Sequence, residues 1–142
     1  MSLGLYLHIP YCFSKCRYCD FYSAPGQRGV PRAYVDALLR ELSRFAPDAP
    51  LRPDTLYFGG GTPSLLDPAD AARLIDAAQP LPGAEITLEA NPETVTEDSL
   101  RAFREAGVSR ISFGVQSARD SQLKTLGRPH TAKQARAAFA AA

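Results

Sequence analysis

Short stretches typical of β-strands alternate along the chain with segments of helical spacing. The strand-like stretches, most of which have a two-residue apolar period, are residues 3–9, 54–61, 85–92 and 110–117. The segments in which apolar residues recur at helical spacing are residues 34–45, 67–78, 97–106 and 131 onward, with a short helical stretch before the last. The pattern therefore predicts four β-strand–α-helix units.

Residues that begin or end regular structure support these boundaries. Pro10 ends the first strand, because proline cannot donate a backbone hydrogen bond. Asp67 is a predicted N-cap followed by Pro68 in the first helical turn, and Gly107 is the predicted end of the third helix. The regular alternation indicates an α/β fold in which helices cover the outside of a parallel sheet.

One face of this sheet is predicted to be polar. In the third strand Ile86 and Leu88 alternate with polar residues that include Glu89. A parallel sheet covered on both faces would be apolar throughout, so we expect the polar face to line a cleft, as in a partial (βα) barrel. Cysteines, glycines, Glu89 and Gln116 end or follow successive strands. This carboxyl edge is where such folds place their sites.

Composition narrows the class of protein. The 142 residues are 45% hydrophobic, which suffices for a core, and 16 basic against 15 acidic residues give a net charge of +1. This balance argues against a nucleic-acid partner. No stretch approaches the roughly 20 apolar residues of a membrane span, and the N-terminus has no basic leader. We therefore expect a cytoplasmic protein whose thiols stay reduced.

All three cysteines, Cys12, Cys16 and Cys19, lie in the stretch CFSKCRYCD. Three thiols cannot pair completely in disulfides, and a reducing compartment disfavours them further. A zinc site completed by His8 or His130 is a stronger alternative, although zinc cysteines usually come in two separate pairs. The spacing C-x3-C-x2-C fits three corners of a cubane iron–sulfur cluster better, and it leaves one iron without a ligand from this chain.

The cysteine stretch resembles the cluster-binding loop of the radical S-adenosylmethionine (SAM) superfamily. Further segments resemble the branch that contains oxygen-independent coproporphyrinogen III oxidase and a heme chaperone: LYLHIPYC, YFGGGTPSLL, EITLEANPET, RISFGVQS and LGRPH. The resemblance implies a 4Fe-4S cluster on the three cysteines and SAM on the open iron, where an electron cleaves it to a 5′-deoxyadenosyl radical. Because four units are too few for a complete barrel, residues 1–142 are expected to be the N-terminal part of the core domain, without the C-terminal domain.

The resemblance also implies which residues contact SAM. Glu89 would bind the ribose hydroxyls beside Gln116, and Arg128 would meet the carboxylate. The full predicted set is Tyr6, Tyr18, Gly60, Gly61, Thr62, Glu89, Gln116 and Arg128. Ordinary roles stay open for each: a plain turn for the glycines, solvated strand ends for Glu89 and Gln116, a surface position for Arg128, and simple packing for the tyrosines.

Phe21 separates two members of the branch. The oxidase carries a further cysteine two residues after the third, and this chain has Phe21 there. Because the first predicted strand begins within a few residues of Met1, we also expect the oxidase's longer N-terminal extension to be missing. Both departures resemble the heme-chaperone subgroup and imply three kinds of partner: heme or another tetrapyrrole, heme-acceptor proteins and an electron donor. The alternatives are a radical SAM enzyme acting on a tetrapyrrole, and a metal-binding module without SAM chemistry.

Overall fold

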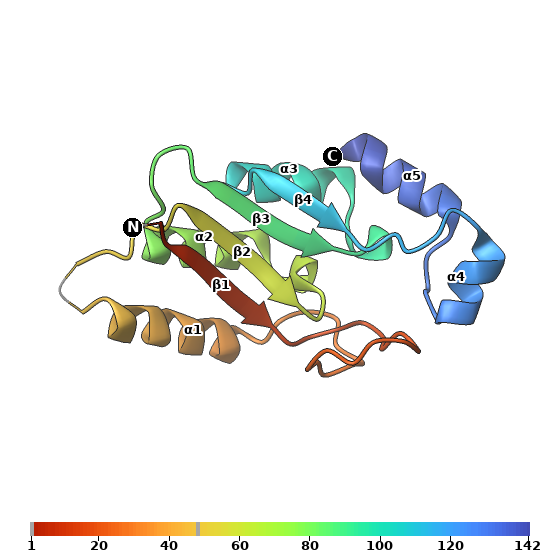
Figure 1. Cartoon of the computed structure of the whole chain (residues 1–142), viewed down its shortest axis with the longest axis horizontal. Coiled ribbons are helices and arrows are strands. Elements are labelled where there is room, and N and C mark those ends of the chain that lie inside the picture. The colour runs from red at the N-terminus through yellow and green to blue at the C-terminus, as the bar shows by residue number, and fades with distance from the viewer. Residues whose placement is uncertain (1, 48) are drawn as a thin grey trace.

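The computed structural model describes residues 2–47 and 49–142. Four parallel strands form one sheet in the order β1-β2-β3-β4 (Figure 1): β1 Gly4–Ile9, β2 Thr55–Gly60, β3 Glu85–Ala90 and β4 Arg110–Phe113. The α-helices are α1 Arg32–Phe45, α2 Pro68–Ala78, α3 Glu97–Glu105, α4 Asp120–Leu126 and α5 Ala132–Ala141. Two short 3-10 helices, η1 Pro63–Leu65 and η2 Pro92–Thr94, follow β2 and β3. The predicted α/β fold with a parallel sheet is confirmed.

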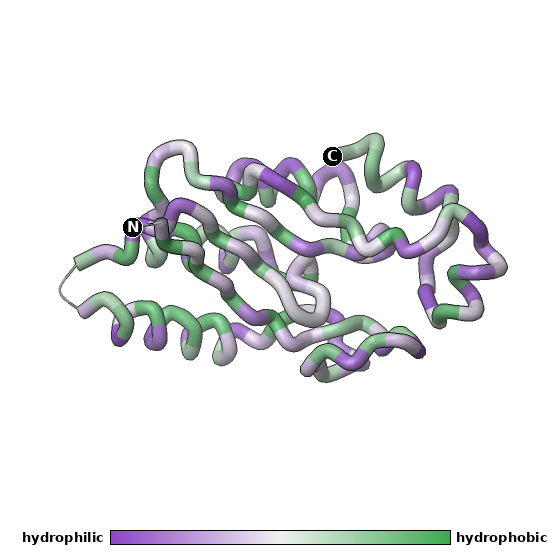
Figure 2. The backbone as a smooth tube through the Cα atoms, in the orientation of Figure 1, coloured by the Kyte–Doolittle hydropathy of each residue, from purple (hydrophilic) through white to green (hydrophobic). Residues whose placement is uncertain are grey.

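The hydrophobic core lies between one face of the sheet and the helices α1 to α3. Leu56, Phe58 and Leu88 from the central strands are fully buried, and Val35 of α1 and Phe103 of α3 pack into the same cluster. Figure 2 shows α1 with hydrophobic turns toward the sheet and hydrophilic turns away from it. Burying one face in this way leaves the other face of the sheet for polar side chains.

One apolar position and the end of one strand depart from the expected pattern. Phe45 shares the helical period of α1 but is 77% exposed, because the buried positions of that helix end at Leu42, one turn earlier. The predicted fourth strand is too long, since β4 ends at Phe113. Beyond it the backbone turns tightly, with Val115 N–H donating to the Phe113 carbonyl at 3.0 Å, and Gln116 takes a left-handed φ of 67°. Gln116 therefore lies in a loop and not at a strand end.

Helix caps fix where the chain returns to the sheet. The Asp67 side chain accepts a hydrogen bond from Ala69 N–H at 2.8 Å at the start of α2, as predicted. Thr96 and Thr131 cap α3 and α5 in the same manner. Gly107, with a φ of 108°, follows α3, as expected of a helix stop. Within the described residues no helix is both long and apolar enough to cross a membrane.

The strands direct their carboxyl ends toward the same end of the molecule. Figure 1 shows all four arrows pointing toward the side that carries the loop after β1 and helix α4. The loop after β1 contains the three cysteines, and α4 is followed by the LGRPH segment. The topology therefore places the unusual residues of the sequence at one edge of the sheet.

Candidate functional site

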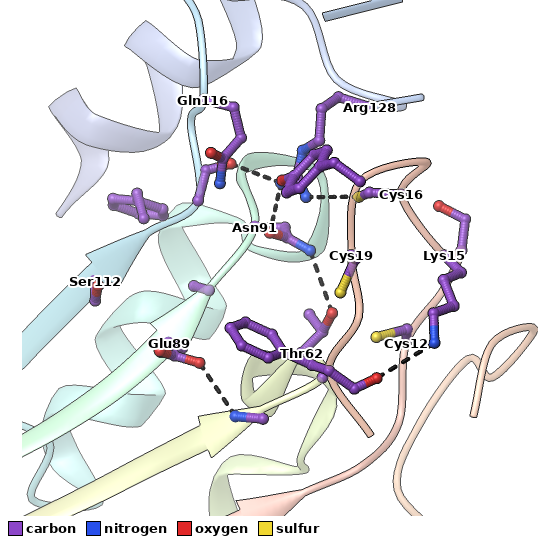
Figure 3. A pocket seen from close by; sticks show the side chains of 18 residues that line it. Cys12, Lys15, Cys16, Cys19, Thr62, Glu89, Asn91, Ser112, Gln116 and Arg128 are labelled. Atoms are coloured by element: carbon purple, nitrogen blue, oxygen red, sulfur yellow. Dashed lines mark hydrogen bonds between the residues drawn. The ribbon is translucent and has the colours of Figure 1, made fainter. Parts of the chain in front are cut away.

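A cavity of about 270 Å³ lies at the carboxyl edge of the sheet. It is near the small end of ligand pockets, which range over roughly 300–1,000 Å³. Ten of the eleven predicted site residues line it (Figure 3): Cys12, Cys16, Cys19, Tyr18, Gly60, Gly61, Thr62, Glu89, Gln116 and Arg128. The structure thus gathers residues from all four strand–helix units around one cavity.

Tyr6 is the predicted contact that the structure keeps out of this cavity. Its ring stacks on Tyr57 at a centroid distance of 5.9 Å, and its hydroxyl lies 3.2 Å from His8 Nδ1. Burial, helped by the Glu89 charge, raises the pKa of the Tyr6 phenol. Tyr6 shares the polar face of the sheet with the site, but β2 lies between its strand, β1, and the strand that carries Glu89, β3.

The cysteine loop is tied down at its base. Cys12 N–H donates to the Ala24 carbonyl at 3.0 Å, and Ala24 N–H donates to the Pro10 carbonyl at 2.6 Å. His8 Nε2 lies 3.0 Å from the Tyr22 carbonyl, so this histidine, a zinc candidate from the sequence, holds the returning arm of the loop. His8 therefore has a structural role as a hydrogen-bonding partner of the loop.

The three thiols are free, and all three lie on the cavity wall. Among residues 2–47 and 49–142, no three histidine, cysteine or acidic side chains converge into a group that could hold a metal ion. In an iron–sulfur cluster each thiolate binds a different iron atom, so its ligands are more widely separated.

The three glycines at the end of β2 and directly after it are required by the protein's own packing. A Cβ on Gly61 would lie 2.6 Å from the Tyr11 carbonyl oxygen and 2.9 Å from Cys12 Sγ. A Cβ on Gly60, whose φ is 117°, would lie 2.7 Å from the His8 ring. The glycines therefore let β2 approach the cysteine loop, in addition to the close approach of a ligand that the sequence suggested.

Glu89 is held by two donors from the neighbouring strand. Tyr57 Oη donates to Glu89 Oε1 at 2.7 Å. Gly60 N–H donates to Oε2 at 3.2 Å, the bond drawn at Glu89 in Figure 3. Burial raises the pKa of the Tyr57 phenol, and the hydrogen bond to Glu89 and its charge add to this. The phenol therefore stays protonated as a donor at neutral pH, and the carboxylate keeps a fixed orientation toward the cavity.

Arg128 is nearly buried, with 9% of its surface exposed, and is not the surface residue that the sequence left open. Its Nη2 donates to Asn91 Oδ1 at 2.5 Å and to the Gly114 carbonyl at 2.6 Å, and its Nη1 donates to Cys16 Sγ at 3.1 Å. Arg128 Nε is buried with no hydrogen-bond partner among the described residues. A buried donor without a partner on the wall of a cavity is suited to an anionic ligand.

Tyr18 lies beside this arginine on the cavity wall and is 48% exposed. Burial raises the pKa of its phenol, although the charge of Arg128 acts in the opposite direction. A neutral aromatic ring at the mouth of the cavity can stack on a ligand.

Sequence reasoning missed the structural roles of two polar residues, of which Asn91 lines the cavity and His130 does not. Asn91 lines the cavity, donates to Thr62 Oγ1 at 3.2 Å and accepts from Arg128. His130, considered from the sequence only as a possible zinc ligand, is 2% exposed, with its ring nitrogens 3.0 Å from Glu93 Oε2 and 3.1 Å from the Val115 carbonyl oxygen. For Asn91 the available signal was its position directly after β3, two residues beyond Glu89. His130 gives no such signal, because its partners are distant in sequence.

Comparison with known proteins identifies the class. Residues 6–142 match the Radical SAM superfamily, and the chain belongs to this family. Over 142 aligned residues the chain is 46% identical to the heme chaperone HemW of Escherichia coli K12, covering 96% of this chain and 38% of that protein. It is 40% identical to the mitochondrial radical S-adenosyl methionine domain-containing protein 1 of Bos taurus, covering 93% of this chain and 31% of that protein.

A solved structure agrees with this assignment. The structure of this chain superposes on that of coproporphyrinogen III oxidase (HemN) from Escherichia coli, a radical SAM enzyme. The TM-score is 0.87 and the sequence identity is 30%. The match covers 99% of this chain and 34% of that structure. The chain thus spans a little over a third of the length of the heme chaperone and about a third of the oxidase.

Proposed function

We propose that this chain forms the cluster- and SAM-binding part of a cytoplasmic heme chaperone that hands heme to acceptor proteins. The observation that carries the proposal is the convergence of Cys12, Cys16 and Cys19 with Glu89 and Arg128 on one cavity. The 46% identity to a heme chaperone supports the choice within the family. Free thiols suit a compartment that keeps cysteines reduced.

The donor set fits the two cofactors that the family implies. Three thiols can ligate three irons of a 4Fe-4S cluster, and the fourth iron is left for SAM. When bound, such a cluster supplies an electron to SAM. Glu89 can accept hydrogen bonds from two ribose hydroxyls, since its oxygens keep lone pairs beyond those used by Tyr57 and Gly60.

Arg128 and the glycines complete this assignment. Three of the five N–H donors of Arg128 are used by Asn91, Gly114 and Cys16, so the guanidinium keeps donor capacity for the SAM carboxylate. Gly60, Gly61 and Thr62 form the wall between Glu89 and Cys12, where backbone groups can receive the methionine ammonium. Tyr18 and Gln116 line the same cavity, where both can contact SAM.

Anaerobic reconstitution of the complete protein tests cofactor binding. We expect about four irons per chain, with loss of most of the iron in Cys12→Ser, Cys16→Ser and Cys19→Ser. Ser14→Ala, an exposed substitution in the same loop, is the matched control and should load normally. A wild-type protein that takes up one zinc and no sulfide-containing cluster would overturn the assignment.

A heme titration of the complete protein tests the chaperone proposal. We expect stoichiometric heme binding, followed by transfer to an apo-acceptor hemoprotein. Protein that neither binds heme nor passes it on contradicts this proposal even when its cluster is intact.

A second candidate is a radical SAM enzyme that modifies a tetrapyrrole. The structural similarity to coproporphyrinogen III oxidase favours it. Phe21 argues for the chaperone, because it lines the cavity rim, 67% exposed, where the oxidase is expected to have another thiol. Reduced, SAM-loaded protein should not convert coproporphyrinogen III. Substrate-dependent release of 5′-deoxyadenosine would instead establish the enzyme.

A further inference from the structure

The tip of the cysteine loop is weakly attached to the rest of the fold. Residues 14–21 are exposed apart from Cys16 and Cys19, which are partly exposed. Inside the loop, Cys19 N–H donates to the Cys16 carbonyl, and Lys15 Nζ donates to the Phe21 carbonyl. These internal bonds shape the tip but do not hold it in place. A segment with so little burial opens easily unless something else restrains it.

The restraint comes from a segment more than a hundred residues away. Arg17 N–H donates to the Leu126 carbonyl at 3.1 Å, and Arg128 Nη1 donates to Cys16 Sγ at 3.1 Å. In the part of the chain that the structure describes, these two bonds are the ones that join residues 14–21 to elements outside the loop. Both fall on the stretch of loop that carries the second and third cysteines.

Gly127, between these two contacts, is packed directly against the loop. A Cβ there would lie 3.1 Å from Arg17 Cγ and 3.4 Å from Arg17 N, and its φ of 74° is left-handed. A Cβ at position 127 would therefore crowd the Arg17 side chain and lie in contact with the loop backbone between Cys16 and Cys19. The close approach needs glycine for both space and conformation.

The segment that holds the loop is itself anchored. Gly127 ends α4, with its N–H donating to the Lys124 carbonyl and Arg128 N–H donating to the Leu123 carbonyl at 2.9 Å. The Leu123 side chain is 1% exposed. The guanidinium of Arg128 reaches the sheet edge through Asn91 and Gly114. The anchor is thus fastened both to a buried helix residue and to the end of the sheet.

We propose that Leu126, Gly127 and Arg128 form a clamp that positions the cysteine loop to receive and retain its cluster. The inference rests on the proposed function, in that the cysteines are the cluster ligands. It adds a positioning role for the backbone of Leu126 and for the absence of a side chain at Gly127. Retention of the cluster, and not the strength of SAM binding, is the property that the clamp controls.

The chain offers a matched control for the experiment. Gly83 has a φ of 80°, close to that of Gly127, but a Cβ there would meet nothing within 4 Å. Gly83→Ala and Gly127→Ala therefore carry similar conformational strain, and they differ in the contact with Arg17. Any excess effect of Gly127→Ala reports the loop contact alone.

In the complete protein, reconstituted anaerobically, iron release to a chelator is followed for wild type and both variants. We expect Gly127→Ala to lose iron faster than Gly83→Ala by on the order of fivefold, because the loop opens more often. Hydrogen exchange of cluster-free protein should show faster exchange at residues 14–21 in Gly127→Ala only. Equal release rates and equal exchange in the two variants would overturn the clamp.

The two proposals fail in distinguishable ways. If the wild type takes up no cluster, the proposed function fails, while hydrogen exchange of the cluster-free loop still decides on the clamp. Should Gly127→Ala not fold, Gly127→Asn compared with Gly83→Asn repeats the test, since asparagine tolerates the left-handed region yet carries a Cβ. Equal exchange at residues 14–21 in that pair refutes the clamp, and faster exchange in Gly127→Asn supports it.

Discussion

Replacing Tyr57 by phenylalanine removes one of the two donors that orient the Glu89 carboxylate. The hydroxyl lies 2.7 Å from Oε1, and after the change only Gly60 N–H, at 3.2 Å, remains. A hydrogen bond to a charged group contributes about 1.5–3 kcal/mol when buried. Both side chains are partly exposed, so we expect a smaller contribution here, about 1 kcal/mol, which is typical of a hydrogen bond between uncharged groups. If Glu89 binds the ribose, SAM affinity should fall about fivefold.

Calorimetric titration of SAM into the cluster-loaded complete protein measures this change. Tyr34→Phe is the matched control, because it also removes a hydroxyl with a 2.7 Å hydrogen bond, but to the His8 carbonyl and not to the Glu89 side chain. The control should leave SAM affinity unchanged. Cluster content must be equal in all samples, so that the comparison reports SAM binding only.

A double-mutant cycle with Glu89→Gln separates positioning from direct contact. If Tyr57 acts through the carboxylate, its removal should cost little once Glu89 is already an amide. The reasoning is refuted if Tyr57→Phe binds SAM like wild type. It is equally refuted if the loss in affinity is the same in the Glu89→Gln background, since Tyr57 would then act independently of Glu89.

Three further predictions concern stability. Asp67→Ala removes the cap of α2 and should lower the free energy of unfolding by about 1 kcal/mol in urea titrations; an unchanged midpoint would show that the cap contributes nothing. Leu88→Ala leaves a cavity in the core and should cost about 2–5 kcal/mol, so a smaller loss would mean that the core collapses around it. The hydrogen bond from Arg73 lowers the pKa of Asp36, so the stability it adds is present above the ordinary carboxyl pKa and is lost as pH falls through the lowered value. Asp36→Asn should therefore flatten the acid side of a plot of melting temperature against pH, and an unchanged slope would contradict this.

Local pattern was sufficient for the elements of this fold. The strand period of residues 85–92 predicted β3, and Asp67 with Pro68 predicted the start of α2. The same reasoning made β4 too long, because RISFGVQS continues its alternation past the point where the backbone leaves the sheet. The turn beyond Phe113 is stabilised by tertiary partners: Arg128 binds the Gly114 carbonyl. Sequence periodicity contains no information about such a partner.

For the site, too, some features could be predicted from local sequence and others depend on tertiary contacts. Its candidate residues were predictable as types, since three clustered thiols, a glycine run and a strand-end carboxylate each have a recognisable chemistry. The sequence did not predict that Tyr6 would lie outside the cavity that the other candidates share. Its ring stacks on Tyr57 instead. Asn91 was missed because a single asparagine after a strand is also typical of an ordinary turn.

The sequence by itself determined the alternation of strands and helices, the caps and the chemical character of the cysteine loop, because these depend on neighbours within one or two turns. Only the tertiary structure decided that Arg128 would be buried against Cys16, 112 residues away, and that Gly127 would press on the loop. Contacts of that range depend on how whole elements pack, and packing is a property of the assembled sheet and helices.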